Sequence, residues 1–390
     1  MIADSIRLTD VGSFPLDAKL DRYLKGAVEL EMNSGSIETD DTRYFITKHN
    51  ETFIRKARAL GPEDAVTGYA QCRGMISQFL LPEMLHAKGI TDFQIDDTIG
   101  ISDMSKQDSQ ILAAAIAVGK VPFANEKSIF PEVFALQHGA KQICEELGIE
   151  RISYKACITG PLELSLNLQR IADFPRTYDE KLMEFLTNVV KGHVNSAIIN
   201  SKQLNAEIVT MDEPTIGFEG LGDFFTDSSS DPNLNHLISC WNRIYNEIPS
   251  NIYRGIHLHR SPFEALFQAK WNLMEAHVGV YVKRQWLEDH DKFVRAAVVR
   301  TDGPTIDDSA DVKASWQEIR AGNYESYLQS AAEMEKHLHD TVSHYRVERI
   351  PFVGPECGFG PWDWKHGPEM AIKTLERLKI VMREYKHNNE

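Results

Sequence analysis

Two histidines separated by one residue, His257 and His259, stand out in the segment Asn-Ile-Tyr-Arg-Gly-Ile-His-Leu-His-Arg. Apolar residues lead into the pair, and Ser261-Pro262 marks the start of the next element. Side chains two residues apart on a strand project from the same face. Two imidazoles at this spacing, where a strand meets a loop, could therefore hold one metal ion. By themselves these residues favour a plainer interpretation, in which polar side chains bond to backbone or carboxylate groups.

A second residue suited to chemistry is Cys357, in the turn-like sequence Gly-Pro-Glu-Cys-Gly. Lone cysteines are usually core residues, but this setting favours a position that faces a cleft. A thiolate close to imidazoles is a soft ligand for zinc. The other four of the five cysteines are scattered and unpatterned, which fits a reducing compartment and predicts a cytoplasmic protein.

The elements that must position these residues are recurring short apolar segments with amphipathic patterns between them. This alternation predicts parallel strands joined by helices. The expected strands lie within 5–13, 64–70, 151–160, 206–214, 251–259, 277–284, 293–303 and 349–358. The expected helices span 42–60, 132–147, 178–202, 233–246, 262–275, 324–344 and 368–385.

About eight such strands predict either a closed barrel or an open doubly wound sheet. No glycine-rich GxGxxG or GxxxxGK[ST] turn follows any strand, which removes the usual nucleotide-binding reason for an open sheet. We therefore predict an α/β fold, a (β/α)₈ TIM barrel, forming one catalytic domain over residues 1–390. An inserted excursion, resembling a strand pair, is expected around residues 90–130.

The composition of the chain argues against some classes of binding partner. The 390 residues carry a formal net charge of −15, which argues against nucleic acid or an anionic membrane surface as the principal partner. The N-terminal segment has no basic region followed by an apolar run, so no signal peptide is expected. No apolar stretch is long enough to predict a membrane span.

In a barrel of this kind, chemistry gathers where the strands end. Polar or ligand-competent residues stand beside small turn residues at most of the expected strand ends. Besides His257, His259 and Cys357, these residues are Ser13, Asp212, Glu213 and Asp302.

The ordered series VGSFP, ITGPLELS, VTMDEPTIG, GIHLHR and FVGPECGFG resembles the catalytic half of cobalamin-independent methionine synthase. The wider group is the methionine-synthase and uroporphyrinogen-decarboxylase-like barrels. The motifs run from Val11 to Gly360, and the length is similar to that of the short, single-barrel members.

The resemblance implies a barrel that holds Zn²⁺, which activates a substrate thiol for attack on a methyl donor. The family's ligands are a His-x-Cys pair on one strand, a Glu on the next strand and a Cys in a Pro-Asp-Cys-Gly turn. By motif, His257 and Cys357 match the first and last ligands, and His259 replaces the second. Within the expected strand 277–284, Val282 or Lys283 occupies the place of the Glu, with Glu275 as a substitute on the preceding helix.

The resemblance also implies substrate contacts from Ser13 and Asp212, with Glu213 in the same turn. Asp302 takes the place of a His that the family uses as an acid near the methyl donor. The implied reaction is methyl transfer from a folate or a corrinoid protein to a small-molecule thiol, by default homocysteine, giving methionine.

Three alternatives remain open at this point. The first is alkyl transfer to another thiol such as coenzyme M. The second is a metal-free lyase or decarboxylase-like barrel whose imidazoles bind substrate carboxylates. The third is a degenerate barrel that only binds a small molecule or partner. Retention of Cys357 and of polar strand ends favours the zinc-dependent transferase.

Overall fold

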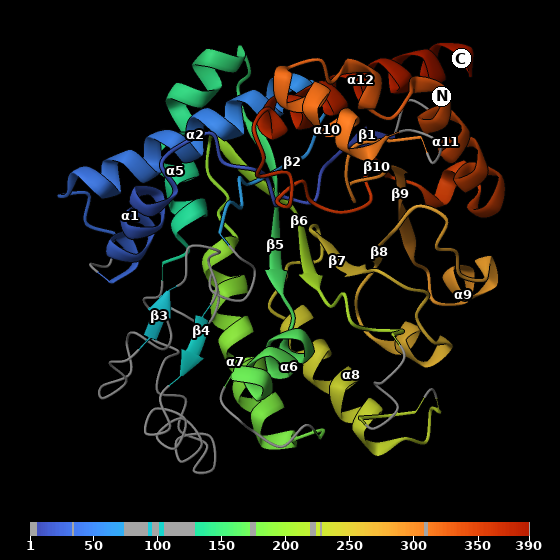
Figure 1. Ribbon diagram of the computed structural model, residues 1–390. Helices are drawn as coiled ribbons and strands as arrows, with labels where there is room; N and C mark the ends of the chain where they lie inside the picture. Colours follow the sequence, from blue (N-terminus) through green and yellow to red (C-terminus); the bar gives the residue numbers. More distant parts are fainter. Residues whose placement is uncertain are drawn as a thin grey trace.

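The computed structural model describes residues 6–32, 35–73, 93–95, 101–104, 129–171, 177–218, 224–226, 228–307 and 311–389. Its centre is an eight-stranded parallel sheet in the order β1-β10-β9-β8-β7-β6-β5-β2. A parallel bridge between Thr9 and Val66 joins the two outer strands. The sheet therefore curves into a nearly closed barrel, and the predicted (β/α)₈ fold is confirmed (Figure 1).

The barrel strands are short and mostly buried, as expected for parallel strands covered by helices. They are β1 (Arg7–Leu8), β2 (Thr67–Gly68), β5 (Ile152–Thr159), β6 (Leu204–Asp212), β7 (Tyr253–Leu258), β8 (Leu273–Ala276), β9 (Phe293–Val299) and β10 (Phe352–Pro355).

The expected strand within 277–284 is wrong, as is the expected helix over 262–275. A short 3₁₀ helix, η3 (Glu264–Gln268), occupies part of the latter interval, and β8 follows it. Gly279 adopts φ +79°, a left-handed conformation that interrupts the alternating sequence after β8. Short apolar runs do not distinguish a strand from a helix by periodicity alone, and this ambiguity caused both errors.

The helices surround the barrel, with α7 and α8 side by side along its outside (Figure 1). Several begin at side-chain caps: Asp179 caps α7, Asp231 caps α8, and Ser330 with Glu333 forms a capping box on α11. The helices are α1 (Leu20–Met32), α2 (Asp40–Leu60), α5 (Pro131–Leu147), α6 (Pro161–Ile171), α7 (Glu180–Ala197), α8 (Pro232–Tyr245), α9 (Arg284–Asp289), α10 (Val312–Ala321), α11 (Ala331–Tyr345) and α12 (Gly367–Asn388).

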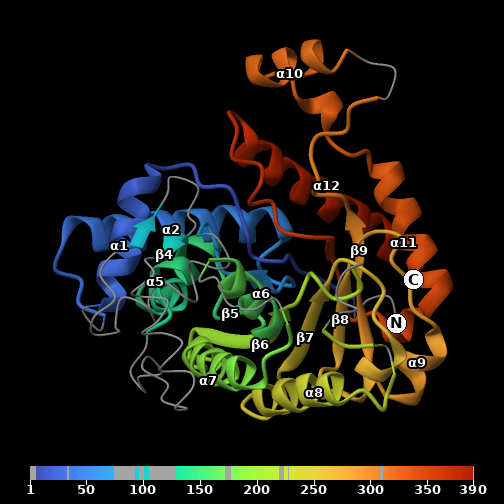
Figure 2. The same cartoon turned by 60° about the horizontal axis from the view of Figure 1, so that its bottom comes forward.

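Two parts of the chain depart from the simple barrel. Strands β3 (Phe93–Ile95) and β4 (Ile101–Met104) pair antiparallel in a separate two-stranded sheet, where the sequence predicted a strand pair. The rest of the predicted excursion at 90–130 lies mostly outside the described residues. Helix α10 stands apart from the barrel wall (Figure 2). Among the described helices, none combines the length and apolar character needed to cross a membrane.

Candidate metal centre

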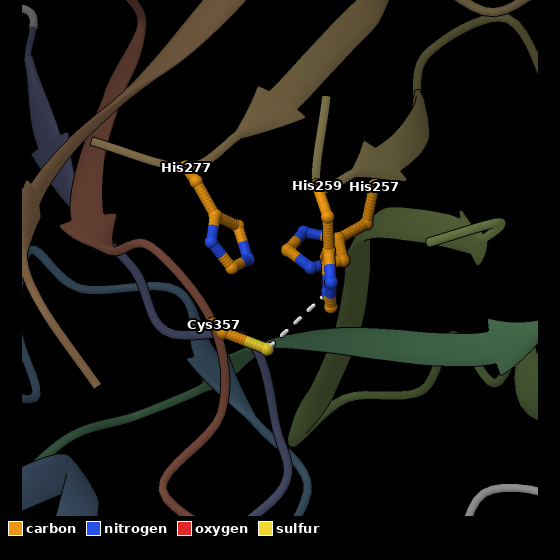
Figure 3. A group of neighbouring side chains, drawn as sticks. All are labelled: His257, His259, His277 and Cys357. Carbon is orange, nitrogen blue, oxygen red and sulfur yellow. Dashed lines mark hydrogen bonds between the residues drawn. The ribbon is translucent and has the colours of Figure 1, made fainter. Parts of the chain in front are cut away.

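Four side chains converge at the C-terminal end of the barrel. His257 lies on β7, His259 just beyond it, His277 just after β8, and Cys357 just after β10. One ligand atom from each residue lies within 4.8 Å of those of the other three. The three imidazoles and the thiol turn toward a common space (Figure 3). We call these four residues the mouth cluster.

Strand register explains why residues distant in sequence meet here. Asp212 on β6 pairs with His257 on β7, which in turn pairs with Glu275 on β8. Glu275 pairs with Arg295 on β9, so one row across four strands carries chemistry-bearing side chains. Parallel strands bring their carboxyl ends to the same edge, and the loops after β7, β8 and β10 then add His259, His277 and Cys357 to this row.

Three ring nitrogens of the cluster lack hydrogen-bond partners among the described residues. His257 is fully buried, and within the described part of the chain neither of its ring nitrogens has a partner. The same holds for Nε2 of His277. Buried polar atoms are rarely left unsatisfied, so these nitrogens indicate a site built for a ligand. Sγ of Cys357 lies 3.8 Å from Nε2 of His259.

Burial sets the protonation of the cluster in the absence of a cation. It lowers the pKa of His257 well below the usual value, and positive neighbours add to the effect. The pKa of His259 falls to about 4, through burial and then the charge of His277. Burial, followed by the charge of Asp212, raises the pKa of the Cys357 thiol to about 12. At neutral pH the imidazoles are neutral, the form that ligates metal, and a bound cation would deprotonate the thiol.

Two buried carboxylates lie behind two of these imidazoles. Oε2 of Glu275 is 3.9 Å from Nδ1 of His257, and Oε2 of Glu356 is 3.8 Å from Nδ1 of His277. Metal-binding histidines commonly turn Nδ1 toward a carboxylate, and at these distances the two contacts are electrostatic rather than hydrogen-bonded. The arrangement leaves the Nε2 atoms of both rings for a metal ion.

Glu275 corrects one expectation from the sequence. Neither Val282 nor Lys283 takes the place of a strand glutamate, because Glu275 itself lies on the strand next to His257. Its charge is already engaged: Lys155 Nζ is 2.5 Å from Oε2, and Thr210 Oγ1 donates to Oε1 at 2.8 Å. Burial alone would raise its pKa, but Lys155 and Arg295 outweigh burial and hold the pKa below the usual value. Glu275 therefore supports the cluster as a paired anion.

His277 is the member of the cluster that the sequence analysis missed. The one-residue spacing of Glu275 and His277 repeats that of His257 and His259, and this was the available signal. It was overlooked because residues 262–275 were assigned to a helix, which hid the strand that carries Glu275.

Among the predicted substrate contacts, Asp212 lies closest to the chemistry. It is 4% exposed at the end of β6, and within the described structure its Oδ1 has no hydrogen-bond partner. Burial, and then the charges of Glu163 and Glu275, raises its pKa to about 8. A cationic group placed beside Asp212 would relieve this cost and would be bound as an ion pair.

Glu213, in the same turn, makes a different set of contacts. Its carboxylate accepts hydrogen bonds from the backbone N–H groups of Leu162 and Glu163 at the start of α6, and from Nε1 of Trp241 on α8. Burial raises its pKa to about 8 even though these bonds favour the charged form. Glu213 thus fastens α6 and α8 to the strand end, which leaves Asp212 as the carboxylate available to a ligand.

Ser13 and Asp302 lie at the rim of the same face. The backbone oxygen of Ser13 accepts a hydrogen bond from the N–H of Phe359, in the loop that carries Cys357. A side chain at Gly358 would come within 2.4 Å of Cβ and 2.9 Å of the backbone oxygen of Ser13, so glycine is required for this close contact. Asp302 is exposed after β9, and its charge reaches both His277 and Glu356.

The donor set fits zinc. Zinc takes neutral imidazole and thiolate ligands in tetrahedral sites, with ligand atoms about 3.3–3.6 Å from one another. The 4.8 Å spread of the mouth cluster needs only small side-chain rotations to reach that arrangement. Nitrogen and sulfur donors exclude magnesium or calcium as the natural ion.

Comparison with solved structures gives barrels of the same architecture. A methyltransferase from Methanosarcina mazei superposes with a TM-score of 0.55 at 12% identity, covering 98% of this chain and 95% of its own. A B12-independent methionine synthase from Shewanella sp. W3-18-1, in complex with selenomethionine, gives 0.56 at 13% identity, covering 98% and 99%. A putative B12-independent methionine synthase from Listeria monocytogenes gives 0.52 at 11% identity, covering 97% and 98%.

These likenesses span nearly the whole of each chain, and at such low identity they establish the shared fold. Neither the protein-family models nor the curated protein sequences give a match. The chain is therefore a TIM barrel with the architecture of methyltransferases and cobalamin-independent methionine synthases, and the particular reaction has to be argued from its own site.

Proposed function

We propose that this chain is a zinc-dependent methyltransferase that alkylates a thiol substrate. The observation that carries the proposal is the mouth cluster: three imidazoles and a thiol gathered at the active end of the barrel, with buried nitrogens that lack partners. When bound, zinc would lower the pKa of a substrate thiol and make it nucleophilic at neutral pH. The fold shared with methyltransferases supports the same reaction class.

Each residue has a role that follows from its surroundings. His257, His259 and Cys357 hold the metal. His277 is the ligand that the substrate thiol replaces, because it lies beyond the end of β8 and its side chain is 27% exposed. A catalytic zinc site keeps one exchangeable position, and the displaced imidazole supplies it.

The acidic and rim residues bind and orient the reactants. Asp212 pairs with an ammonium group of the thiol substrate, and Ser13 provides a polar contact at the rim. Asp302, exposed beside the cluster, would pass a proton to the nitrogen of a folate donor as that nitrogen gives up its methyl group to the thiolate. A corrinoid-protein donor would give up its methyl group without a proton. With homocysteine as the thiol, the product is methionine.

The surroundings of the cluster discriminate among substrates. Coenzyme M carries a sulfonate in place of the amino-acid end of homocysteine, so it brings no ammonium group to pair with the buried carboxyl of Asp212, whose pKa is raised to about 8. We therefore favour an amino-acid thiol. A metal-free lyase would need charged imidazoles to bind carboxylates, whereas burial lowers the pKa of His257 and of His259.

The test measures thiol binding to the zinc-loaded protein by calorimetry. Repeating the titration in buffers with different heats of ionisation gives the number of protons released on binding. Homocysteine should bind with release of about one proton from its thiol, because metal ligation deprotonates a thiol, and of up to one more from Asp212 as it pairs with the ammonium group. Coenzyme M should bind at least about 10-fold more weakly, since it lacks the ion pair with Asp212. His277→Ala should hold zinc more weakly in the absence of thiol, because one ligand is gone, but should keep proton release when the thiol binds, whereas Cys357→Ser should lose both. Binding without proton release would contradict the proposal, as would tighter binding of coenzyme M. Turnover with folate or corrinoid donors then identifies the methyl source.

A further inference from the structure

A second cavity lies between α10 and the loop that follows β10. It has a volume of about 370 Å³ and is lined by Lys313, Trp316, Gln317, Arg320 and Trp364. Both segments follow the carboxyl ends of barrel strands, so the cavity opens on the same face of the barrel as the mouth cluster. Helix α10 projects from that face, away from the wall (Figure 2). We call it the α10 cavity.

Two half-buried indoles form perpendicular walls of the α10 cavity. The ring centroids of Trp316 and Trp364 are 5.1 Å apart at an interplanar angle of 90°. A flat ring laid on the face of one indole would meet the edge of the other, and aromatic pairs favour both geometries.

The remaining lining supplies positive charge. The guanidinium carbon of Arg320 lies 5.9 Å from the ring centroid of Trp316, and the exposed Lys313 stands two turns earlier on the same helix. Among the described residues, neither side chain forms an ion pair with a carboxylate. The chain as a whole has a formal net charge of −15, so two unpaired cations beside aromatic walls are unusual in it. Their charge favours an anionic ligand in the α10 cavity.

Rings behind the cavity fix the Trp364 wall in place. Trp362, which is 3% exposed, packs 5.6 Å from Trp364 and 4.9 Å from Phe359. Its Nε1 donates to the backbone oxygen of Thr301 at 2.9 Å. A wall held by buried neighbours is pre-organised for binding, which reduces the entropy lost when a ligand is held.

We propose that the α10 cavity binds a flat aromatic carboxylate, with its ring against Trp316 and Trp364 and its anionic group held by Arg320 and Lys313. This site is separate from the mouth cluster, shares none of its residues and requires no metal. The proposal therefore stands or falls independently of the proposed methyl transfer.

The experiment measures binding of 2-naphthoate to the full-length, metal-depleted protein by calorimetry. Two comparison compounds separate the contributions: 2-naphthamide keeps the ring without the charge, and cyclohexanecarboxylate keeps the charge without the aromatic face. We expect one site for 2-naphthoate, with affinity at least about 10-fold above either comparison compound, since both stacking and charge are required.

Variants locate the site. Trp316→Ala and Trp364→Ala should each weaken binding by about 10-fold or more through lost stacking. Arg320→Gln should remove most of the preference for naphthoate over naphthamide, whereas Arg383→Gln, an exposed arginine on α12, should leave it unchanged. Trp364→Phe keeps a ring and guards against misfolding of the alanine variant. Absence of saturable binding, equal affinity for naphthamide, or insensitivity to both Trp316→Ala and Trp364→Ala would overturn the proposal.

Discussion

The same kinds of ligand side chain gather at two places among the described residues, and at only one of the two do buried ring nitrogens lack hydrogen-bond partners. The second group, Glu184 on α7 with His236 and Cys240 on α8, also brings its ligand atoms within 4.8 Å of one another. We call it the helix cluster. By residue type alone, the helix cluster and the mouth cluster are equally good candidates for zinc.

The neighbours of the two clusters differ. Arg243 donates to Oε2 of Glu184 at 2.6 Å and to Sγ of Cys240 at 3.3 Å. The ring of His236 contacts Tyr178 through Nδ1, at 2.8 Å, and Glu184 through Nε2, at 3.1 Å. Every ligand of the helix cluster therefore has a partner already, and a cation there would also meet the charge of Arg243.

The ligand atoms of the mouth cluster have no such cationic partner, because the neighbouring lysine and arginine side chains bond to other groups. Lys155 and Arg295 lie on Glu275, beneath the imidazoles, so that no guanidinium or ammonium group bonds to the ring nitrogens or to Cys357 among the described residues. Unsatisfied donor atoms therefore distinguish two clusters that residue types alone do not separate.

The largest effect is expected from breaking the buried ion pair below the mouth cluster. Glu275→Gln leaves Lys155 buried and uncompensated, which should reduce the free energy of unfolding by about 3–5 kcal/mol. Glu184→Gln breaks a pair in the helix cluster whose side chains are 44% and 39% exposed, and should cost less than about 1 kcal/mol. Urea denaturation of both variants measures the difference. Equal, small changes would show that Glu275 and Lys155 are not a tightly coupled pair.

A smaller effect is expected from Glu356, which orients His277. Its carboxylate accepts hydrogen bonds from the N–H groups of Thr301 and Val278, at 3.0 and 3.1 Å, and so joins two of the loops around the cluster. Glu356→Gln should weaken zinc affinity by about 10- to 100-fold, as loss of a carboxylate behind a ligating histidine does. Competition with a chromophoric chelator measures the affinity. Glu184→Gln is the matched control, and a loss of affinity in that variant instead would reverse the assignment of the two clusters.

The pH dependence of the free energy of unfolding tests whether the carboxyl of Asp212 has a raised pKa in the folded protein. With a pKa of about 8 in the folded state, against about 3.9 when unfolded, the carboxyl binds more protons folded than unfolded over that interval. The contribution of Asp212 to the free energy of unfolding therefore falls as pH rises from about 4 to about 8. Relative to the wild type, metal-depleted Asp212→Asn should gain at least about 1 kcal/mol of stability across this range. Urea melts at several pH values test this, and parallel curves for the two proteins would contradict it.

The smallest effect is expected when the ligand atoms of the helix cluster are released from their bonds to Arg243. Arg243→Met removes the side chain that bonds both Glu184 and Cys240, and adds a side chain of similar length. We expect a second, weak zinc equivalent, which Arg243→Lys does not give because the charge remains. Calorimetric titration counts the equivalents. If wild-type protein already binds two zinc ions equally well, the contrast between the clusters is lost.

Sequence patterns anticipated the barrel and three members of the mouth cluster, because strand ends and loops are marked by local residue choice. His257, His259 and Cys357 each follow an apolar run and stand beside turn residues. The sequence did not reveal which side chains from distant segments bond to one another. The pairing of Glu275 with Lys155 joins residues 120 positions apart, and the contacts of Glu213 with α6 and α8 depend on how the helices pack. His277 was lost for a local reason, the misassigned strand before it.

Zinc stoichiometry in purified protein, measured by mass spectrometry, tests the central claim most directly. The account predicts about one zinc per chain, lost in His257→Ala and Cys357→Ser and retained in His236→Ala and Cys240→Ser. Circular dichroism of each variant confirms that the fold persists. Full loss of zinc in the helix-cluster variants, or protein prepared without chelator that binds no zinc when it is supplied, would contradict the account.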